Sequence, residues 1–321
     1  QVIEDGSCAN VSTASNFVSG ARPIYRSKAT VNGNWTTVAN WEMAFATAGP
    51  WVDACDYPTA ANSSEVIIQS GTRIVLDIDN DIDKITVEAT ATFEILPDSR
   101  LTLYDANVGA DFILYGTFLY RANSANTLDF EDPAGTPKAT WIFNSGATFI
   151  KTNTSSADDF NTYYEGGMVN MPSVGSWIYR YNGDGNPYTG AADYFYPDLY
   201  FENTDNTGLF DFDNTLMALT GSAAICTVYG NMYVGATGTG QVKVYNNNIS
   251  TDAMLVYGNL TVGTGSTFTN ELCSCSVSSS RDNGTGLEIK GNISNNGILD
   301  INSSNVGKLE FSGTTTQIVE G

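Results

Sequence analysis

The chain has 321 residues, and 35 acidic against 14 basic side chains give it a formal net charge of −21, with no histidine at all. A charge of this sign repels nucleic acid and anionic membrane surfaces, so we expect neither nucleic-acid binding nor membrane insertion. The absence of histidine removes the commonest general base and the commonest metal ligand.

The composition indicates a folded all-β protein with many turns. Hydrophobic residues make up 42% of the chain and charged residues only 15%, which is unlike a disordered polypeptide. No run of 18 apolar residues is present, so we expect no membrane-spanning helix. The first residue is Gln1, and we expect an extracellular or cell-surface protein that is exported through a cleaved signal peptide.

Residues 1–62 are predicted to be an irregular lead-in and an N-terminal cap. The first thirty residues lack any hydrophobic periodicity, and Trp35 and Trp41 then follow only six residues apart. These two tryptophans are the candidate core of the cap. The best helix candidate in the chain spans residues 41–48.

The five cysteines have no zinc-type spacing. In a chain with an extracellular composition, we predict a disulfide between Cys8 and Cys55 that holds the N-terminus. The odd number leaves at least one thiol that is free or bonded outside the chain.

Residues 63–154 are predicted to form the first coils of a β-solenoid. Short alternating or apolar runs recur, and each ends at Gly, Asp, Asn or Pro, which is typical of strands and turns. These runs are EVIIQSG (65–71), TRIVLDID (72–79), DKITVEA (83–89), ATFEILP (91–97) and RLTLYDA (100–106).

Residues 155–198 differ from their surroundings, and we predict an aromatic-rich loop insertion. Exposed aromatic rings with Asn and Asp nearby would suit sugar rings or a protein partner. The alternative is that alternate aromatic residues pack as one strand face. The candidate ligand- or partner-binding residues are Trp177, Tyr179, Tyr181, Tyr188, Tyr194 and Tyr196.

Residues 199–321 return to short strands, which we expect to continue as solenoid coils beyond the chain end. VYGNMYVG starts at Val228, VYGNLTVG starts at Val256, and a looser copy, IKGNISNN, starts at Ile289. Recurring strands with Gly or Asn between them favour a right-handed parallel β-helix, with a β-sandwich or barrel as the alternative. The predicted corners are Gly230, Gly258 and Gly291, where we expect backbone conformations with φ > 0.

One block of the sequence resembles the opening of large secreted β-helix proteins of Bacteroidetes-type bacteria, which are related to the G8 domain. The resemblance covers residues 31–105 and, more loosely, the tail LEFSGTTTQIVEG. It implies an exported surface protein, with many such proteins read as adhesins. The matching residues are Gly33, Trp35, Trp41, Pro58, Val66, Ile68, Gly71, Ile74, Leu76 and Asp77.

The densest cluster of charge is a candidate calcium site. In one extended strand, alternate residues share a face, so four aspartates could converge on a hard cation through oxygen ligands. The alternative is a solvated strand face with Ile78 and Ile82 directed inward. The predicted ligands are Asp77, Asp79, Asp81 and Asp83.

Catalysis is not expected. Pectin-type β-helix hydrolases resemble one another in Asn-Thr-Asp, Asp-Asp and Gly-His-Gly motifs. This chain has Asp158-Asp159 before Asn203-Thr204-Asp205, which is the reverse order, and it has no histidine for the third motif. A glycoside hydrolase that uses two carboxylates is the enzymatic alternative.

The predicted function is therefore an extracellular, non-enzymatic module for structure or adhesion, a rigid stalk or a subunit of a surface assembly or filament. The expected contacts are self-association or other surface proteins at the solenoid ends. The alternative is a carbohydrate-binding or polysaccharide-processing β-helix that uses residues 155–200.

Overall fold

The computed structural model describes most of the chain from Arg22 to Gly321. Statements about structure refer to these residues only. The gaps are 105–108, 122–127, 130–138, 152–177, 182–193, 203–209, 212–225, 236–241, 246–253, 270–284 and 301–307.

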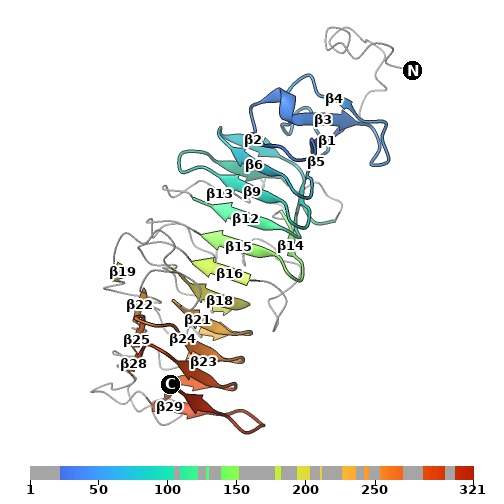
Figure 1. The fold of residues 1–321 in the computed structure, drawn as a ribbon. Coiled ribbons are helices and arrows are strands. Elements are labelled where there is room, and N and C mark those ends of the chain that lie inside the picture. The colour runs from blue at the N-terminus through green and yellow to red at the C-terminus, as the bar shows by residue number, and fades with distance from the viewer. Residues whose placement is uncertain are drawn as a thin grey trace. The chain divides into compact units, whose positions relative to one another are not determined.

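The described chain is all-β, and nearly all of its strands pair in parallel (Figure 1). Its one described helix is a single 3-10 turn, η2 (Val38–Asn40). Two compact units divide the chain. Unit 1 holds the described residues up to Ala147, and unit 2 holds those from Thr148 onward. The sequence pattern predicted boundaries after residues 62, 154 and 198.

Three sheets build unit 1. The first is seven-stranded with the order β14-β11-β8-β5-β1-β3-β4, and the third has the order β13-β10-β7. The strands of the second sheet that belong to unit 1 have the order β2-β6-β9-β12. The first contains β14 (Trp141–Phe143), β11 (Phe112–Leu114), β8 (Ile85–Val87), β5 (Glu65–Ile68), β1 (Ile24–Ser27), β3 (Trp41–Ala44) and β4 (Val52–Asp53). The others contain β2 (Asn32–Asn34), β6 (Arg73–Leu76), β9 (Thr92–Ile95), β12 (Thr117–Tyr120), β13 (Leu128–Asp129), β10 (Leu101–Leu103) and β7 (Asn80–Ile82).

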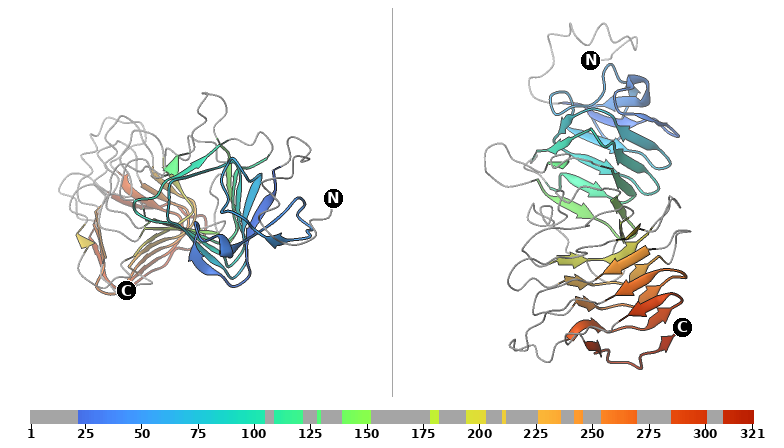
Figure 2. Two further views of the ribbon diagram at one scale, coloured as in Figure 1. Left: turned by 90° about the horizontal axis from the view of Figure 1, so that it is seen from above. Right: turned by 90° about the vertical axis from the view of Figure 1, so that its left-hand side faces the viewer.

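Consecutive strands of unit 1 visit the three sheets in rotation. β5, β6 and β7 lie in the first, second and third sheets, and β8, β9 and β10 then repeat that order. We call each such set of three consecutive strands a coil. Each strand pairs with the strand one coil later, as in β6 with β9, and Figure 2 shows the strands of each sheet in unit 1 side by side.

From β17 onward, the strands of unit 2 rotate through three sheets in the same way. Their orders are β15-β16-β18-β21-β24-β27-β30, β17-β20-β23-β26-β29 and β19-β22-β25-β28. The first contains β15 (Thr148–Lys151), β16 (Ile178–Tyr181), β18 (Asp198–Phe201), β21 (Met232–Val234), β24 (Leu260–Val262), β27 (Ile293–Asn295) and β30 (Val319–Glu320). The second contains β17 (Tyr194–Tyr196), β20 (Cys226–Val228), β23 (Met254–Val256), β26 (Thr285–Ile289) and β29 (Lys308–Phe311). The third contains β19 (Phe210–Asp211), β22 (Val242–Tyr245), β25 (Thr267–Thr269) and β28 (Ile298–Asp300).

In-register pairing places like residues above one another inside unit 1. Ile74, Phe93 and Phe118 are register partners across three coils, and all three are buried. The rings of Phe93 and Phe118 stack with their centroids 5.6 Å apart. Burial of a large apolar side chain stabilises a fold by roughly 1.5–3 kcal/mol, so such columns are the main favourable contribution to the unit.

The first sheet of unit 1 contains the exception to parallel pairing. β1 pairs in parallel with β5 on one side and antiparallel with β3 on the other, and β3 pairs antiparallel with β4. The prediction of a helix over residues 41–48 is therefore wrong. Within β3, Trp41 and Met43 are buried while Glu42 is half-exposed, and this period of two fits a strand that has partners on both sides.

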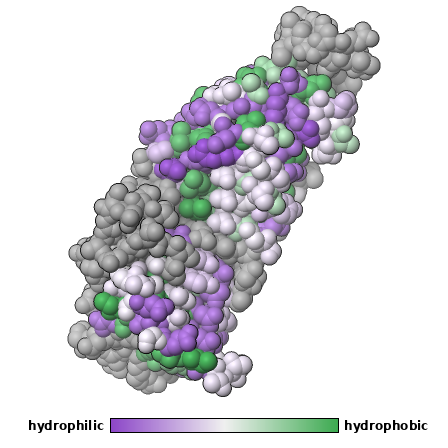
Figure 3. Space-filling view, viewed as in Figure 1, coloured by the Kyte–Doolittle hydropathy of each residue, from purple (hydrophilic) through white to green (hydrophobic). Residues whose placement is uncertain are grey.

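No described helix has the length and apolar character that a membrane crossing requires. On the face drawn in Figure 3, hydrophobic residues of the described chain lie singly or in small groups among hydrophilic and intermediate ones.

Candidate functional site

The first coil of unit 1 is covered by a segment that we call the N-terminal cap, residues 35–62. On the first sheet, β3 and β4 close the outer edge of β1. On the second sheet, Asn40 Nδ2 donates to the carbonyl oxygen of Asn34, at the end of β2, over 2.8 Å. On the third sheet, the N–H of Ala60 donates to the carbonyl oxygen of Asp81 in β7 over 2.6 Å. Each of the three sheets therefore has described cap residues bonded to its first strand, where an open edge would invite another chain.

The two tryptophans form the centre of the cap. Both are fully buried, and their ring centroids lie 4.8 Å apart in an edge-to-face arrangement. Trp41 Nε1 donates to the carbonyl oxygen of Trp35 over 2.7 Å, and Trp35 Nε1 donates to that of Pro58 over 2.9 Å. Both indole N–H groups are thus satisfied in the interior, as buried polar groups require.

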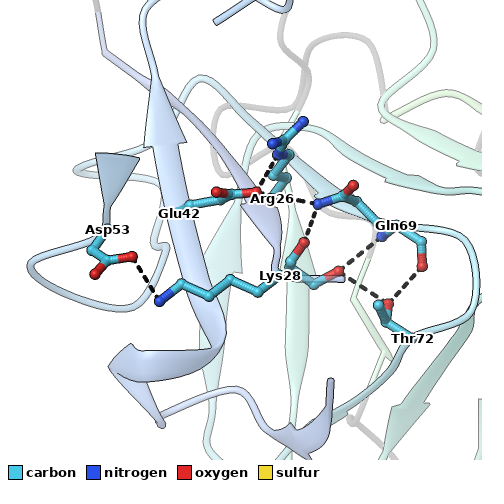
Figure 4. A network of polar contacts seen from close by, with 7 residues as sticks. Arg26, Lys28, Glu42, Asp53, Gln69 and Thr72 are labelled. Atoms are coloured by element: carbon cyan, nitrogen blue, oxygen red, sulfur yellow. Dashed lines mark hydrogen bonds and ion pairs between the residues drawn. The ribbon is translucent and has the colours of Figure 1, made fainter. Parts of the chain in front are cut away.

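A polar network attaches the cap to the first coil (Figure 4). Arg26 Nε donates to Glu42 Oε1 over 2.5 Å, which joins β1 to β3, and the Arg26 guanidinium lies 3.9 Å from the ring centroid of Trp51. Gln69 reaches the same carboxylate oxygen over 3.5 Å. Lys28 Nζ lies 2.8 Å from an oxygen of Asp53 at the edge of β4.

Buried hydroxyl groups extend this network inward. The N–H of Gln69 donates to Ser27 Oγ over 2.8 Å, and Thr72 Oγ1 donates to the carbonyl oxygen of Gln69 over 2.6 Å. Since the Thr72 proton is used there, Ser27 donates its own across the 3.0 Å to Thr72 Oγ1. The neighbouring Tyr25 phenol has its pKa raised by burial and then by the negative charge of Asp56, so it stays protonated.

The predicted calcium ligands do not lie in one strand. β6 ends at Leu76 and β7 begins at Asn80, so Asp77 and Asp79 lie in the corner between the two strands. The chain bends at Ile78, whose side chain is 37% exposed, so the expectation that Ile78 points inward is wrong. Ile82 is fully buried, as predicted.

Each of these four aspartates contacts a different group. Thr36 donates to Asp77, the N–H of Arg100 donates to Asp79, Tyr104 donates its hydroxyl to Asp81, and Arg22 pairs with Asp83. In the described part of the chain, no three His, Cys, Asp or Glu residues form a metal-binding group. Calcium binding at these residues stays a prediction.

Most of the predicted aromatic binding residues lie where their side chains are not described. Trp177 and Tyr188 fall outside the described residues, Tyr179 and Tyr181 belong to β16, and Tyr194 belongs to β17. Tyr196 is only 1% exposed, so the expectation that it presents a ring to a surface ligand is wrong. Asp158 and Asp159 also lie outside the described residues.

Cys55 is disulfide-bonded. Its predicted partner, Cys8, lies outside the described residues, so the pairing stays a prediction.

The glycine corners of unit 2 form a continuous row of hydrogen bonds, which we call the corner row. Asp198 Oδ1 accepts from the N–H of Asn231 over 2.6 Å, and Asn231 Oδ1 accepts from the N–H of Asn259 over 2.9 Å. Asn259 Oδ1 then accepts from the N–H of Asn292 over 2.8 Å, and Asn292 Oδ1 accepts from that of Ile318 over 2.9 Å. The recurring Gly-Asn pairs of the sequence thus have a shared structural role, in which Asn bonds to the next coil.

Close approach of the backbone explains the three glycines. Their φ angles lie outside the left-handed region, so the expectation of φ > 0 at Gly230, Gly258 and Gly291 is wrong. A Cβ on Gly258 would lie 2.5 Å from the carbonyl oxygen of Gly230 and 2.6 Å from Asn231 Oδ1. Glycine is needed because the acceptor groups of the preceding coil occupy the space of a side chain.

Aromatic rings flank the corner row on the outside of unit 2. Tyr229 and Tyr257 directly precede two of the glycines, and their rings stack with centroids 5.4 Å apart. Lys290 precedes the third, with Nζ 3.9 Å from the ring centroid of Tyr257. Tyr200 and Tyr233, which are register partners, stack at 4.2 Å. Because the rings stack on one another, each pair covers one face of each ring.

Comparison with known proteins gives no relative. No family model matches the chain, and neither the curated proteins nor the solved structures contain a match. The resemblance to G8-related β-helix proteins therefore stays a prediction.

We predict that Glu42→Ala loosens the cap selectively. The substitution removes the acceptor that Arg26 and Gln69 share, at a cost of about 1–2 kcal/mol for charge-assisted bonds. Amide hydrogen exchange in β3 and β4 should quicken roughly tenfold while β9 stays unchanged. The matched control is Asp53→Ala, which removes a carboxylate whose side chain is 77% exposed and should have a small effect. Equal effects of the two variants would show that the shared carboxylate of Glu42 does not hold the cap.

We also predict that Gly258→Ala destabilises unit 2 by about 1–3 kcal/mol, because the added Cβ overpacks against Gly230 and Asn231. Urea unfolding followed by circular dichroism measures the change. Thr264→Ala, in a nearby exposed turn, is the control and should change stability by no more than about 0.5 kcal/mol. An unfolding midpoint for Gly258→Ala that equals the control would contradict the close-approach explanation.

Proposed function

We propose that this chain is a right-handed parallel β-solenoid that acts as a rigid, non-enzymatic module for extracellular structure or adhesion. The observation that carries the proposal is the in-register parallel pairing of each strand with the strand one coil later, in both units. In the described part of unit 2, polar side chains at the corners bond one coil to the next. The corner row, for example, commits the Oδ1 atoms of three asparagines to bonds between coils.

The arrangement of scarce positive charge fits a structural role. Glu94 on β9 has a side chain that is only 2% exposed, and it pairs with Arg73 from the preceding coil and with Arg121 after β12. Two of the 14 basic residues of the chain are thus placed on one carboxylate. A buried carboxylate between two coils contributes to specificity when both partners are present and is costly when one is lost.

We propose that a partner binds at the last described coil of the stack and not at the first. Cap residues are bonded to the first strands of all three sheets in unit 1. On the last coil, by contrast, four large hydrophobic residues are exposed by 40–61%, in β28, in β29 and around β30. They are Ile298, Phe311, Ile318 and Val319.

The solenoid is tested by cross-linking neighbouring coils. Thr261 and Ser294 are register partners on β24 and β27, and adjacent strands lie about 4.8 Å apart, within reach of a disulfide. We expect Thr261→Cys with Ser294→Cys to form an intramolecular disulfide, detected by peptide mass spectrometry. The control is Tyr233→Cys with Ser294→Cys, which lie two strands apart and should not cross-link. Cross-linking in the control but not in the first pair would contradict the coil order.

The functional role is tested by binding and turnover assays together. We expect the purified protein to bind a cell-surface protein or glycan in an array, and to release no sugar from polysaccharide substrates. Asp158→Asn serves as the matched variant. Sugar release that this substitution abolishes would overturn the non-enzymatic proposal in favour of a carboxylate glycoside hydrolase.

A further inference from the structure

The corner row of unit 2 has a direction. At every described step the side-chain oxygen belongs to one coil and the backbone N–H to the coil that follows it in the sequence. The acceptors are Asp198, Asn231, Asn259 and Asn292, and the successive donors lie 33, 28, 33 and 26 residues further along the chain. The corner N–H of each coil is therefore bonded to a side-chain oxygen of its predecessor, and the side-chain oxygen of each asparagine in the row accepts from its successor.

Unit 1 gives a comparison within the same chain, since its corner bonds run in both directions. Asp79 and Asp111 accept from the N–H groups of Arg100 and Thr140, which follow them by one coil. Glu88, however, accepts from the N–H of Ser70 in the preceding coil. Coil stacking therefore allows a bond in either direction, so the forward direction of the corner row does not follow from stacking alone.

The two ends of the corner row differ chemically. It starts at a carboxylate, Asp198, whose Oδ1 accepts from both the N–H and the Nδ2 of Asn231. Hydrogen bonds to a charged acceptor are stronger than those to an amide oxygen, so the first step is the most favourable one. At the other end, Ile318 takes the place of Asn and has no side-chain acceptor.

Gln317 completes that end. Its Nε2 donates to the carbonyl oxygen of Gly291 over 2.6 Å. At the preceding corner the equivalent bond comes from backbone, since the N–H of Gly291 donates to the carbonyl oxygen of Gly258. Its Oε1 accepts from the N–H of Gly313 over 3.0 Å. A side chain thus satisfies the last corner in place of backbone, and the row of side-chain acceptors ends there.

We infer that the coils of unit 2 fold in sequence from the Asp198 end towards the Ile318 end, with Asp198 as the starting acceptor and Gln317 as the stop. Each folded coil presents acceptors to the next coil before that coil docks. A coil that folded ahead of its predecessor would have its corner N–H without the side-chain acceptor that the corner row supplies. Loss of an early acceptor therefore delays every later coil, while loss of a late one affects only the last coil.

The test is folding of the full chain followed by pulse-labelling hydrogen exchange and mass spectrometry. Asp198→Ala should slow protection of β21, β24 and β27 about tenfold, since it removes a bond that forms in the rate-limiting step. Asn292→Ala should leave those folding rates within twofold and speed exchange at Ile318 and β30 about tenfold. Asn296→Ala, at an exposed asparagine that directly follows β27, is the matched control and should change neither.

Two results would overturn the inference. One is equal slowing by Asp198→Ala and Asn292→Ala, and the other is greater slowing by Asn292→Ala, which would reverse the direction. If Asp198→Ala fails to fold, Asp198→Asn replaces it, because the amide keeps an acceptor and removes only the charge. Its folding should then be slower than that of the unsubstituted chain by about threefold, and an unchanged rate would contradict the starting role of the carboxylate.

Discussion

Parallel pairing between successive coils is the constraint on which the rest of the structure depends. A parallel strand satisfies its backbone groups only when neighbours lie on both sides, so every coil needs another coil or a cap. In unit 1 the cap meets this need with two antiparallel strands, a 3-10 turn and a pair of buried tryptophans. The same constraint explains why large apolar residues recur at matching positions, since each must fill the space above its register partner.

The stacking of coils also determines how close the acidic side chains lie to one another. A chain of net charge −21 whose coils lie about 4.8 Å apart brings acidic residues close together on its surface. The structure responds by giving individual carboxylates their own donors, as at Asp77 and Asp79, or by placing one between two arginines, as at Glu94. Asp77 and Asp79 thus have local hydrogen-bond donors, and the buried Glu94 has two arginines as partners.

Much of the fold could be predicted from the sequence, because strand periodicity is local. The runs from Glu65 and from Ile85 alternate in burial much as their residue types indicate. The cap strands could not be predicted, since the pairing of β3 with β1 depends on residues that are distant in the sequence. For the same reason the corner at Ile78 was missed, because a run of alternating aspartates looks identical in a strand and around a bend.

For the candidate site, the sequence indicates which residues matter but not the physical reason. The importance of Gly258 could be predicted from repetition, but its cause could not, because a backbone contact with Gly230 exists only after two coils have stacked. Repetition of Asn after Gly was the available signal for the corner row, and its meaning required the direction of each hydrogen bond.

In the corner row, the distance between successive coils does not depend on the number of residues in each coil. Its steps span between 26 and 33 residues, yet its four donor–acceptor distances stay between 2.6 and 2.9 Å. Residues gained or lost elsewhere in a coil therefore need not disturb the register of the strands. A frame of this kind is suited to evolutionary change, since lineages can vary the connecting segments, and with them the outer surface, while the stacked core stays the same.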